Sequence, residues 1–178
     1  VSTKYSLVRL RDFDAQEVNL RKSDLSRSEM RRADFEKSDL RNANMSRAIA
    51  AGADFEKANL AKANFSQADL AEADMEKADM TGANLSGAIM TNVLAKRVSL
   101  VGANLTKADM ERVRLERADL TAVGMQRANL KYADLERATL RNAEMKDAQM
   151  EGAGRTRVGL TGASRPEARR DGATIRPA

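Results

Sequence analysis

A five-residue repeat runs through most of this 178-residue chain without a single change of phase. Between Leu20 and Leu160 there are 29 positions at multiples of five, and 26 of them carry Leu, Met or Phe. The exceptions are Ala50, Ala95 and Arg155. Two residues before each of the 29 lies Ala, Ser or Val, and the residue between is Asp or Asn in 17 cases. A repeat this regular constrains the fold more than any other feature of the chain.

A period of five fits neither an α-helix nor a straight β-strand. In a helix, five residues advance the side-chain direction by about 140°, so the large apolar residues would spiral around every face. In a strand the side-chain period is two, so successive repeats would point to opposite sides. The pattern is buried on one side only if the backbone turns a corner in every repeat. Four right-angle corners make a square coil of 20 residues, and such coils stack at about 4.8 Å.

The other residues of each repeat agree with this coil. Only a small side chain can share the narrow interior with the central Leu, Met or Phe. Asp and Asn before the centre are expected to bond nearby backbone and to tolerate turn geometry. Six glycines stand two places after a centre, which suits a corner with positive φ: Gly52, Gly82, Gly87, Gly102, Gly152 and Gly162.

These units resemble the pentapeptide-repeat family. The resemblance rests on units such as Ala58-Asn59-Leu60, Ala68-Asp69-Leu70, Ala83-Asn84-Leu85 and Ala118-Asp119-Leu120, each followed by two variable residues. It covers about four fifths of the chain. It implies an all-β fold, a right-handed quadrilateral β-helix, here with about seven coils of 20 residues.

We expect three segments along the chain. Residues 1–17 are predicted to be an N-terminal cap, because Phe13 stands where a small residue is required. The β-helix is predicted over 18–163, with Arg155 ending its core and Leu160 completing a last coil. Residues 164–178 are Arg- and Pro-rich and are predicted to be a tail.

Two repeats break the pattern, at Ile49-Ala50 and at Leu94-Ala95. In each, the centre shrinks to Ala while the preceding position becomes apolar. The sequence predicts that Ile49 or Leu94 turns inward to fill the space and distorts the corner; a loop tip or a contact surface is the functional alternative. Ile89 is also apolar where Asp is usual, on the same wall as Ile49.

One outer wall pairs acidic and basic columns and is the candidate docking wall. Its members recur every 20 residues: Glu36, Lys37, Glu56, Lys57, Glu76, Lys77, Lys96, Arg97, Glu116, Arg117, Glu136 and Arg137. The order of charge flips at Lys96. Such columns are interpreted either as neutralising ladders that keep the rod soluble or as a patterned surface that selects a partner.

The composition excludes most chemistry. There is no Cys and no His, which removes disulfides, thiolate catalysis and the usual zinc sites. Ser, Asp and Glu are plentiful but periodic, and no pair stands out as nucleophile and base. Leu, Met and Phe fill the interior, with Phe35 expected to stack on Phe55. We therefore expect no catalytic residue, no metal, no cofactor, no small-molecule ligand and no enzyme activity.

These features predict a non-enzymatic rigid solenoid that acts as a protein–protein interaction or structural module within a larger bacterial protein or assembly. The alternative, implied by the family resemblance, is a DNA mimic that binds DNA gyrase and protects it from quinolones. An acidic strip supports that alternative, but the net charge of +5 and the Gly-, Arg- and Pro-rich end argue against it. The strip comprises Asp34, Glu36, Asp54, Glu56, Asp74 and Glu76.

A third hypothesis, binding of nucleic acid or anionic membrane, relies on a run of arginines near the C-terminus. No aromatic residue interleaves with them to stack on bases, which argues against it. The run comprises Arg155, Arg157, Arg165, Arg169, Arg170 and Arg176. The chain is expected to be cytoplasmic. Because it begins with Val1, an upstream targeting sequence could precede it.

Overall fold

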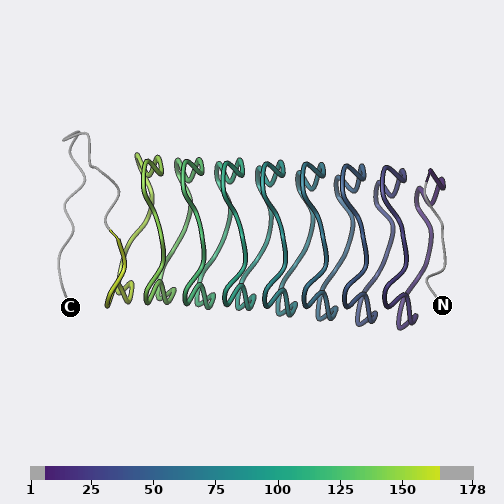
Figure 1. Cartoon of the computed structure of the whole chain (residues 1–178), viewed down its shortest axis with the longest axis horizontal. Helices are drawn as coiled ribbons and strands as arrows, with labels where there is room; N and C mark the ends of the chain where they lie inside the picture. The colour runs from purple at the N-terminus through teal and green to yellow at the C-terminus, as the bar shows by residue number, and fades with distance from the viewer. Residues whose placement is uncertain (1–6, 165–178) are drawn as a thin grey trace.

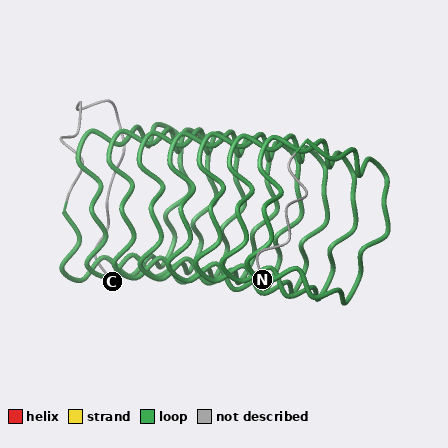
Figure 2. Ribbon diagram, turned by 45° about the vertical axis from the view of Figure 1, so that its right-hand side comes forward, coloured by secondary structure: helices red, strands yellow, loops and turns green. Residues whose placement is uncertain are grey.

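The computed structural model describes residues 7–164. Within that range the chain winds as a right-handed quadrilateral β-helix, with about eight coils that follow one another along a rod (Figure 1). No helix and no strand of several residues occurs among the described residues. Each side of a coil instead contributes one bridge residue, flanked by turns. The described chain is accordingly drawn as loop throughout (Figure 2). The family's all-β fold, expected from the sequence, is confirmed.

Parallel bridges join residues that are 20 apart, from Arg9 with Glu29 to Glu144 with Ser164. The bridge residue is always the one before the apolar centre, where Asp and Asn predominate. Stacked at about 4.8 Å per coil, the described coils form a rod about 38 Å long. The sequence had predicted about seven coils, and the structure extends this by starting the pattern earlier.

In the inner coils, four of the five backbone N–H groups of a repeat bond other backbone groups. In the repeat around Phe35, the Phe35 N–H donates to Asp54 O at 2.7 Å and the Lys37 N–H to Glu56 O at 2.9 Å, both in the next coil. The Asp39 N–H donates back to the preceding coil, and the Ser38 N–H closes the corner onto Phe35 O at 3.1 Å. The repeat is thus a β-turn held between two neighbouring coils.

The fifth N–H belongs to the first corner residue, and its need for an acceptor explains why Asp and Asn predominate at the bridge position. The side-chain Oδ1 of every Asp or Asn at the bridge position accepts a hydrogen bond from the backbone two residues on, as Asp34 does from Glu36 at 2.9 Å. A buried or half-buried N–H without a partner is costly. The predicted bonding of these side chains to nearby backbone is therefore confirmed.

The second corner residue always has positive φ. The six glycines at this position have φ between 63° and 72°, as the sequence predicts, but Lys57 at 58° and Tyr132 at 58° adopt the same conformation. A turn with positive φ at its third residue usually carries Gly or Asn there, because other side chains are strained in this conformation. Here the coil imposes the conformation on every residue type.

The core is a set of four apolar columns, one for each side of the square. Phe35, Leu60 and Leu120 have no exposed surface, and the alanines two places before the centres are buried as well, from Ala33 to Ala148. Phe35 and Phe55 stack with ring centroids 5.3 Å apart and planes 6° apart, as predicted. Phe65 meets Phe55 edge-on at 5.8 Å.

The predicted inward rotation at the two irregular repeats is wrong. Ala50 and Ala95 keep the inward position and are buried, whereas Ile49 and Leu94 remain partly exposed bridge residues. The backbone ladder overrides side-chain size, because turning Ile49 or Leu94 inward would break bonds to both neighbouring coils. At Ala95, the flanking positions carry buried Val93 and Val98 in place of Ala, which restores volume.

The two ends of the described rod are less buried than its middle. The backbone pattern begins at Leu7 and the bridges at Arg9, before the predicted start at residue 18. Phe13 is 50% exposed. At the other end Arg155 points to the interior, and its Nη2 donates to Met150 O at 2.7 Å. Burial lowers the pKa of Arg155. Residues 1–6 of the predicted cap and 165–178 of the predicted tail lie outside the described residues.

Candidate functional site

The docking wall consists of the two corner residues that follow the centres at positions 35, 55, 75, 95, 115 and 135. The charges of these residues form a ladder along the rod. Lys57 Nζ lies 2.9 Å from Glu56 Oε1 and 3.2 Å from Glu36 Oε1 in the preceding coil. Lys77 repeats this contact with Glu56 at 3.0 Å. Each of these two lysines therefore joins two coils.

The ion pairs shift the pKa values of the ladder in the expected directions. Hydrogen bonds from Lys57 and then Lys77 hold the pKa of Glu56 below its ordinary value. Lys57 and Lys37 do the same for Glu36. The pKa of Lys57 is raised in turn by Glu56 and Glu36. Glu36, Glu56 and Lys57 therefore stay charged at neutral pH. Their ion pairs are solvent-exposed, so the contribution of these pairs to stability is small.

The ladder is interrupted where the charge order flips. Lys77 is the last lysine of the first segment. Glu76 makes no ion pair within residues 7–164, and the ion pairs of the following coils belong to a separate group. There Lys96 Nζ lies 3.1 Å from Glu116 Oε1, and Arg114 Nη2 lies 3.2 Å from the same oxygen. The wall is thus divided into two charged segments.

Glu116 is the most buried of the wall's ion-paired carboxylates. Burial alone would raise the pKa of Glu116, but its own backbone N–H, Lys96 and Arg114 together hold that pKa below the ordinary value. Its Oε2 is buried and has no hydrogen-bond partner among the described residues. Arg137 approaches Glu136 at 3.6 Å. Arg97 and Arg117 form no ion pair within the part of the chain that the structure describes.

Leu94 lies beside the interruption of the ion ladder. It stands in the bridge column between Asp74 and Arg114, next to the corner that begins with Lys96. The irregular pair Leu94-Ala95 and the charge flip at Lys96 belong to the same repeat, so Leu94 lies at the edge between the docking wall and the adjoining side. The result is a partly exposed apolar residue with the acidic Asp74 before it and the basic Arg114 after it in the same bridge column.

An acidic column runs along the side adjoining the docking wall. Successive bridges stack Asp14, Asp34, Asp54 and Asp74. Burial raises the pKa of Asp54, the Glu56 N–H opposes this, and the charges of Asp74 and Asp34 add to the increase. The predicted acidic strip is thus contiguous, but it ends at Leu94.

The other irregular residues lie on a different side. Bridges stack Ile49, Asp69 and Ile89 in one column, as the sequence predicts, and Ile89 is 46% exposed. One charged residue separates the two isoleucines, so they make no continuous apolar patch.

Sequence reasoning missed an amide ladder in the bridge column of residues 24, 44, 64, 84 and 104. The side-chain amide of each Asn donates to the residue one coil before it, from Asn44 with Asp24 at 3.1 Å to Asn104 with Asn84 at 3.5 Å. Reading residues 44, 64, 84 and 104 as one column of a 20-residue coil would have found it. Within residues 7–164, no group of three or more acidic residues is placed to hold a metal ion. No helix of the described chain could cross a membrane.

Comparison with known proteins identifies the family. The pentapeptide repeats model matches in eight copies over residues 9–49, 51–87, 78–121, 99–131 and 118–153. No curated protein matches the chain. Among solved structures, HetL, a pentapeptide repeat protein involved in heterocyst differentiation regulation in the cyanobacterium Nostoc, is 26% identical over 93% of this chain and 92% of its own, with a TM-score of 0.34.

Two further structures are similar. A trypsin-treated form of QnrB1, a plasmid-mediated fluoroquinolone resistance protein, is 15% identical over 85% of this chain and 86% of its own, with a TM-score of 0.57. A pentapeptide repeat protein from the Arabidopsis thaliana thylakoid lumen is 29% identical over 63% of this chain and 71% of its own, with a TM-score of 0.45. The repeat model, matched across most of the coil, shows that this chain belongs to the pentapeptide repeat family.

Proposed function

We propose that this chain is a non-enzymatic protein-docking rod, that its partner binds the docking wall around Leu94, and that it works in the cytoplasm as a module of a larger bacterial protein or assembly. The observation that carries the proposal is that a partly exposed leucine at the edge of the docking wall coincides with an interruption of the ion ladder and with a lysine in place of the wall's usual glutamate. Protein interfaces commonly combine an apolar centre with a polar, charged rim.

Pre-organisation of the wall supports this role. The lysines of the ladder are tied to two coils, and the backbone beneath them is bonded above and below. A partner therefore loses little entropy in ordering this surface. The opposite charges on the two sides of Leu94 would orient a partner of complementary charge order and reject one of the reverse order.

The repeat itself offers a variant that separates docking from folding. Leu94→Asn restores the residue type that usually precedes a centre and supplies an Oδ1 acceptor for the Lys96 N–H. We expect it to leave the melting temperature unchanged or higher. Ile89→Asn makes the same change on the neighbouring side and is the matched control.

The measurement is quantitative capture of partners by the tagged chain and by both variants from the host's lysate. Docking at the wall predicts that a stoichiometric partner is lost about tenfold or more with Leu94→Asn and kept with Ile89→Asn. Equal recovery by all three chains would refute a site at Leu94. Parallel loss with both variants would show a general surface effect instead.

The second candidate is a DNA mimic that binds DNA gyrase. The stacked column of Asp14, Asp34, Asp54 and Asp74 favours it, because four carboxylates at about 4.8 Å spacing make a local negative stripe. The lysines of the docking wall neutralise the neighbouring glutamates, and Arg114 reverses the charge beyond Leu94. Gyrase supercoiling in the presence of a fluoroquinolone tests it: protection by the chain would establish this candidate, and no effect would dismiss it.

A further inference from the structure

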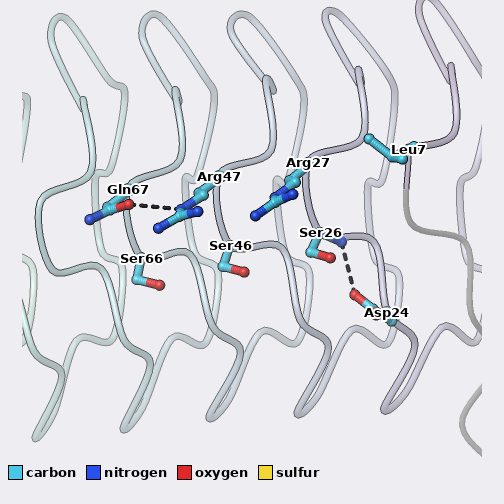
Figure 3. Close-up of a pocket in the computed structure, with 8 residues that line it drawn as sticks. All are labelled: Leu7, Asp24, Ser26, Arg27, Ser46, Arg47, Ser66 and Gln67. Carbon is cyan, nitrogen blue, oxygen red and sulfur yellow. Dashed lines mark hydrogen bonds between the residues drawn. The ribbon is translucent and has the colours of Figure 1, made fainter.

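A hollow of about 450 Å³ lies on the corner diagonally opposite the docking wall, across the first coils of the rod. Figure 3 shows two rows of side chains along it, one with Arg27, Arg47 and Gln67, and one with serines. The serines are Ser26, Ser46 and Ser66, which occupy the same place in successive coils. We call this hollow the Ser–Arg groove.

The serines are held in place but their hydroxyls are unused. The backbone N–H of Ser26 donates to Asp24 at 3.1 Å, that of Ser46 to Asn44 at 3.2 Å and that of Ser66 to Asn64 at 3.1 Å. None of the three hydroxyls makes a hydrogen bond within residues 7–164. Three fixed donors therefore border the same hollow, about one coil rise apart.

The arginines across the groove are not neutralised. Neither Arg27 nor Arg47 forms an ion pair in the described part of the chain, unlike Arg32 and Arg41 on other corners. Arg47 Nε donates to Gln67 Oε1 at 2.9 Å, which orients its guanidinium and leaves its terminal nitrogens free for a ligand. Two guanidinium groups one coil apart are close enough to share one anionic group.

Acidic residues are scarce around the groove. The five repeats of this side at 43–47, 63–67, 83–87, 103–107 and 123–127 contain no Asp and no Glu. The one carboxylate at the groove belongs to Asp24, whose Oδ1 already accepts from the Ser26 N–H and from the Asn44 amide. The groove therefore has an excess of donors and of positive charge.

We propose that the Ser–Arg groove binds a phosphate or diphosphate oxyanion, with Arg27 and Arg47 pairing its charge and the serine hydroxyls donating to its remaining oxygens. Charge-assisted bonds from arginine to phosphate are among the strongest hydrogen bonds in proteins. This site departs from the expectation, based on the filled interior, that the chain has no small-molecule ligand, because the groove lies outside the coil.

The test is titration of the isotope-labelled full chain with inorganic pyrophosphate, followed by NMR at constant ionic strength. We expect saturable shifts of the Ser26, Ser46 and Ser66 amides. Arg47→Gln should weaken binding by about tenfold, and Arg27→Gln together with Arg47→Gln should abolish it. Arg117→Gln removes the same charge at the same turn position on the docking wall and should bind as the unchanged chain does.

A variant with the opposite effect guards against loss of binding through misfolding. Asp24→Asn keeps the Oδ1 acceptor and removes the one negative charge, so it should tighten binding, by about threefold. A parallel titration with adenosine diphosphate distinguishes a free diphosphate from one carried on an organic group, according to which binds more tightly. Shifts that sodium chloride reproduces, or equal weakening by Arg117→Gln and Arg47→Gln, would overturn the proposal.

Discussion

Truncation of one central leucine tests whether the stacked interior holds the rod together. Leu120 has no exposed surface and lies between Leu100 and Leu140, which are equally buried. Its backbone is tied to the next coil by the bond from its N–H to Thr139 O at 2.7 Å, and Leu100 is tied to Asp119 O at 2.8 Å. Leu120→Ala therefore leaves a cavity whose walls are fixed by the ladder on both sides.

The expected cost follows from that geometry. Removing three buried carbons forfeits about 2.4 kcal/mol, at about 0.8 kcal/mol each. A cavity that cannot close adds about 1 kcal/mol, so the free energy of unfolding should fall by about 3–4 kcal/mol. Leu120→Met keeps the volume and should cost less than about 1.5 kcal/mol. Urea unfolding followed by circular dichroism measures both. A Leu120→Ala chain within about 0.5 kcal/mol of the unchanged chain would refute the close-packed column.

Three more predictions concern the corners and sides. Burial raises the pKa of Asp54 above its value in the unfolded chain, so ionisation of Asp54 destabilises the fold as the pH rises through the unfolded and then the folded pKa. Asp54→Asn should therefore stabilise the rod at pH 7 and lose this advantage below the unfolded pKa. Melting curves at both pH values measure this difference. Asn59→Ile removes the acceptor for the Ala61 N–H, 3.3 Å away, at a position type where Ile89 shows that isoleucine fits. It should cost about 1–2 kcal/mol in urea unfolding, and no loss would contradict the role given to the side-chain oxygen. A Cβ at Gly152 would lie 2.6 Å from Tyr132 Cδ1, whereas a Cβ at Gly102, which has a similar φ, would meet nothing within 4 Å. Gly152→Ala should therefore lower the melting temperature more than Gly102→Ala. Adding Tyr132→Ala should remove the difference.

Much of this fold could be predicted from the sequence because every repeat carries the same physical requirement. Leu60, Leu85 and Leu120 must each point inward, and only a corner in every five residues allows this. The column positions follow directly, which is why the stacking of Phe35 on Phe55 and the alignment of Ile49 with Ile89 were predictable.

The failures share one cause, which is that side-chain size was given more weight than backbone bonding. The inward rotation of Ile49 and Leu94 was expected because Ala50 and Ala95 leave space. The structure keeps both outside, since the ladder of bonds between coils is uninterrupted there. The same ladder lets the coil begin near Arg9 although Phe13 does not suit the interior.

The candidate sites could be predicted only in part. The charge columns of the docking wall are readable from the 20-residue spacing, but the bridging of two coils by Lys57 and the gap at Leu94 depend on side-chain conformations. The Ser–Arg groove was even less predictable. The column of Ser26, Ser46 and Ser66 is evident in the sequence, whereas the hollow beside it and the free guanidiniums emerge only from the folded corner.

Site-specific photo-crosslinking in the native host tests the docking wall most directly. A photo-reactive amino acid would replace Arg97, on the docking wall beside Leu94, or Lys107, on the diagonally opposite corner. Both are exposed second corner residues, with φ of 57° and 61°. The proposed function predicts a discrete crosslinked protein from position 97 that disappears when Leu94→Asn is added, and none of that species from position 107. The same crosslinked species from both positions, or from position 107 alone, would contradict a partner that docks on this wall.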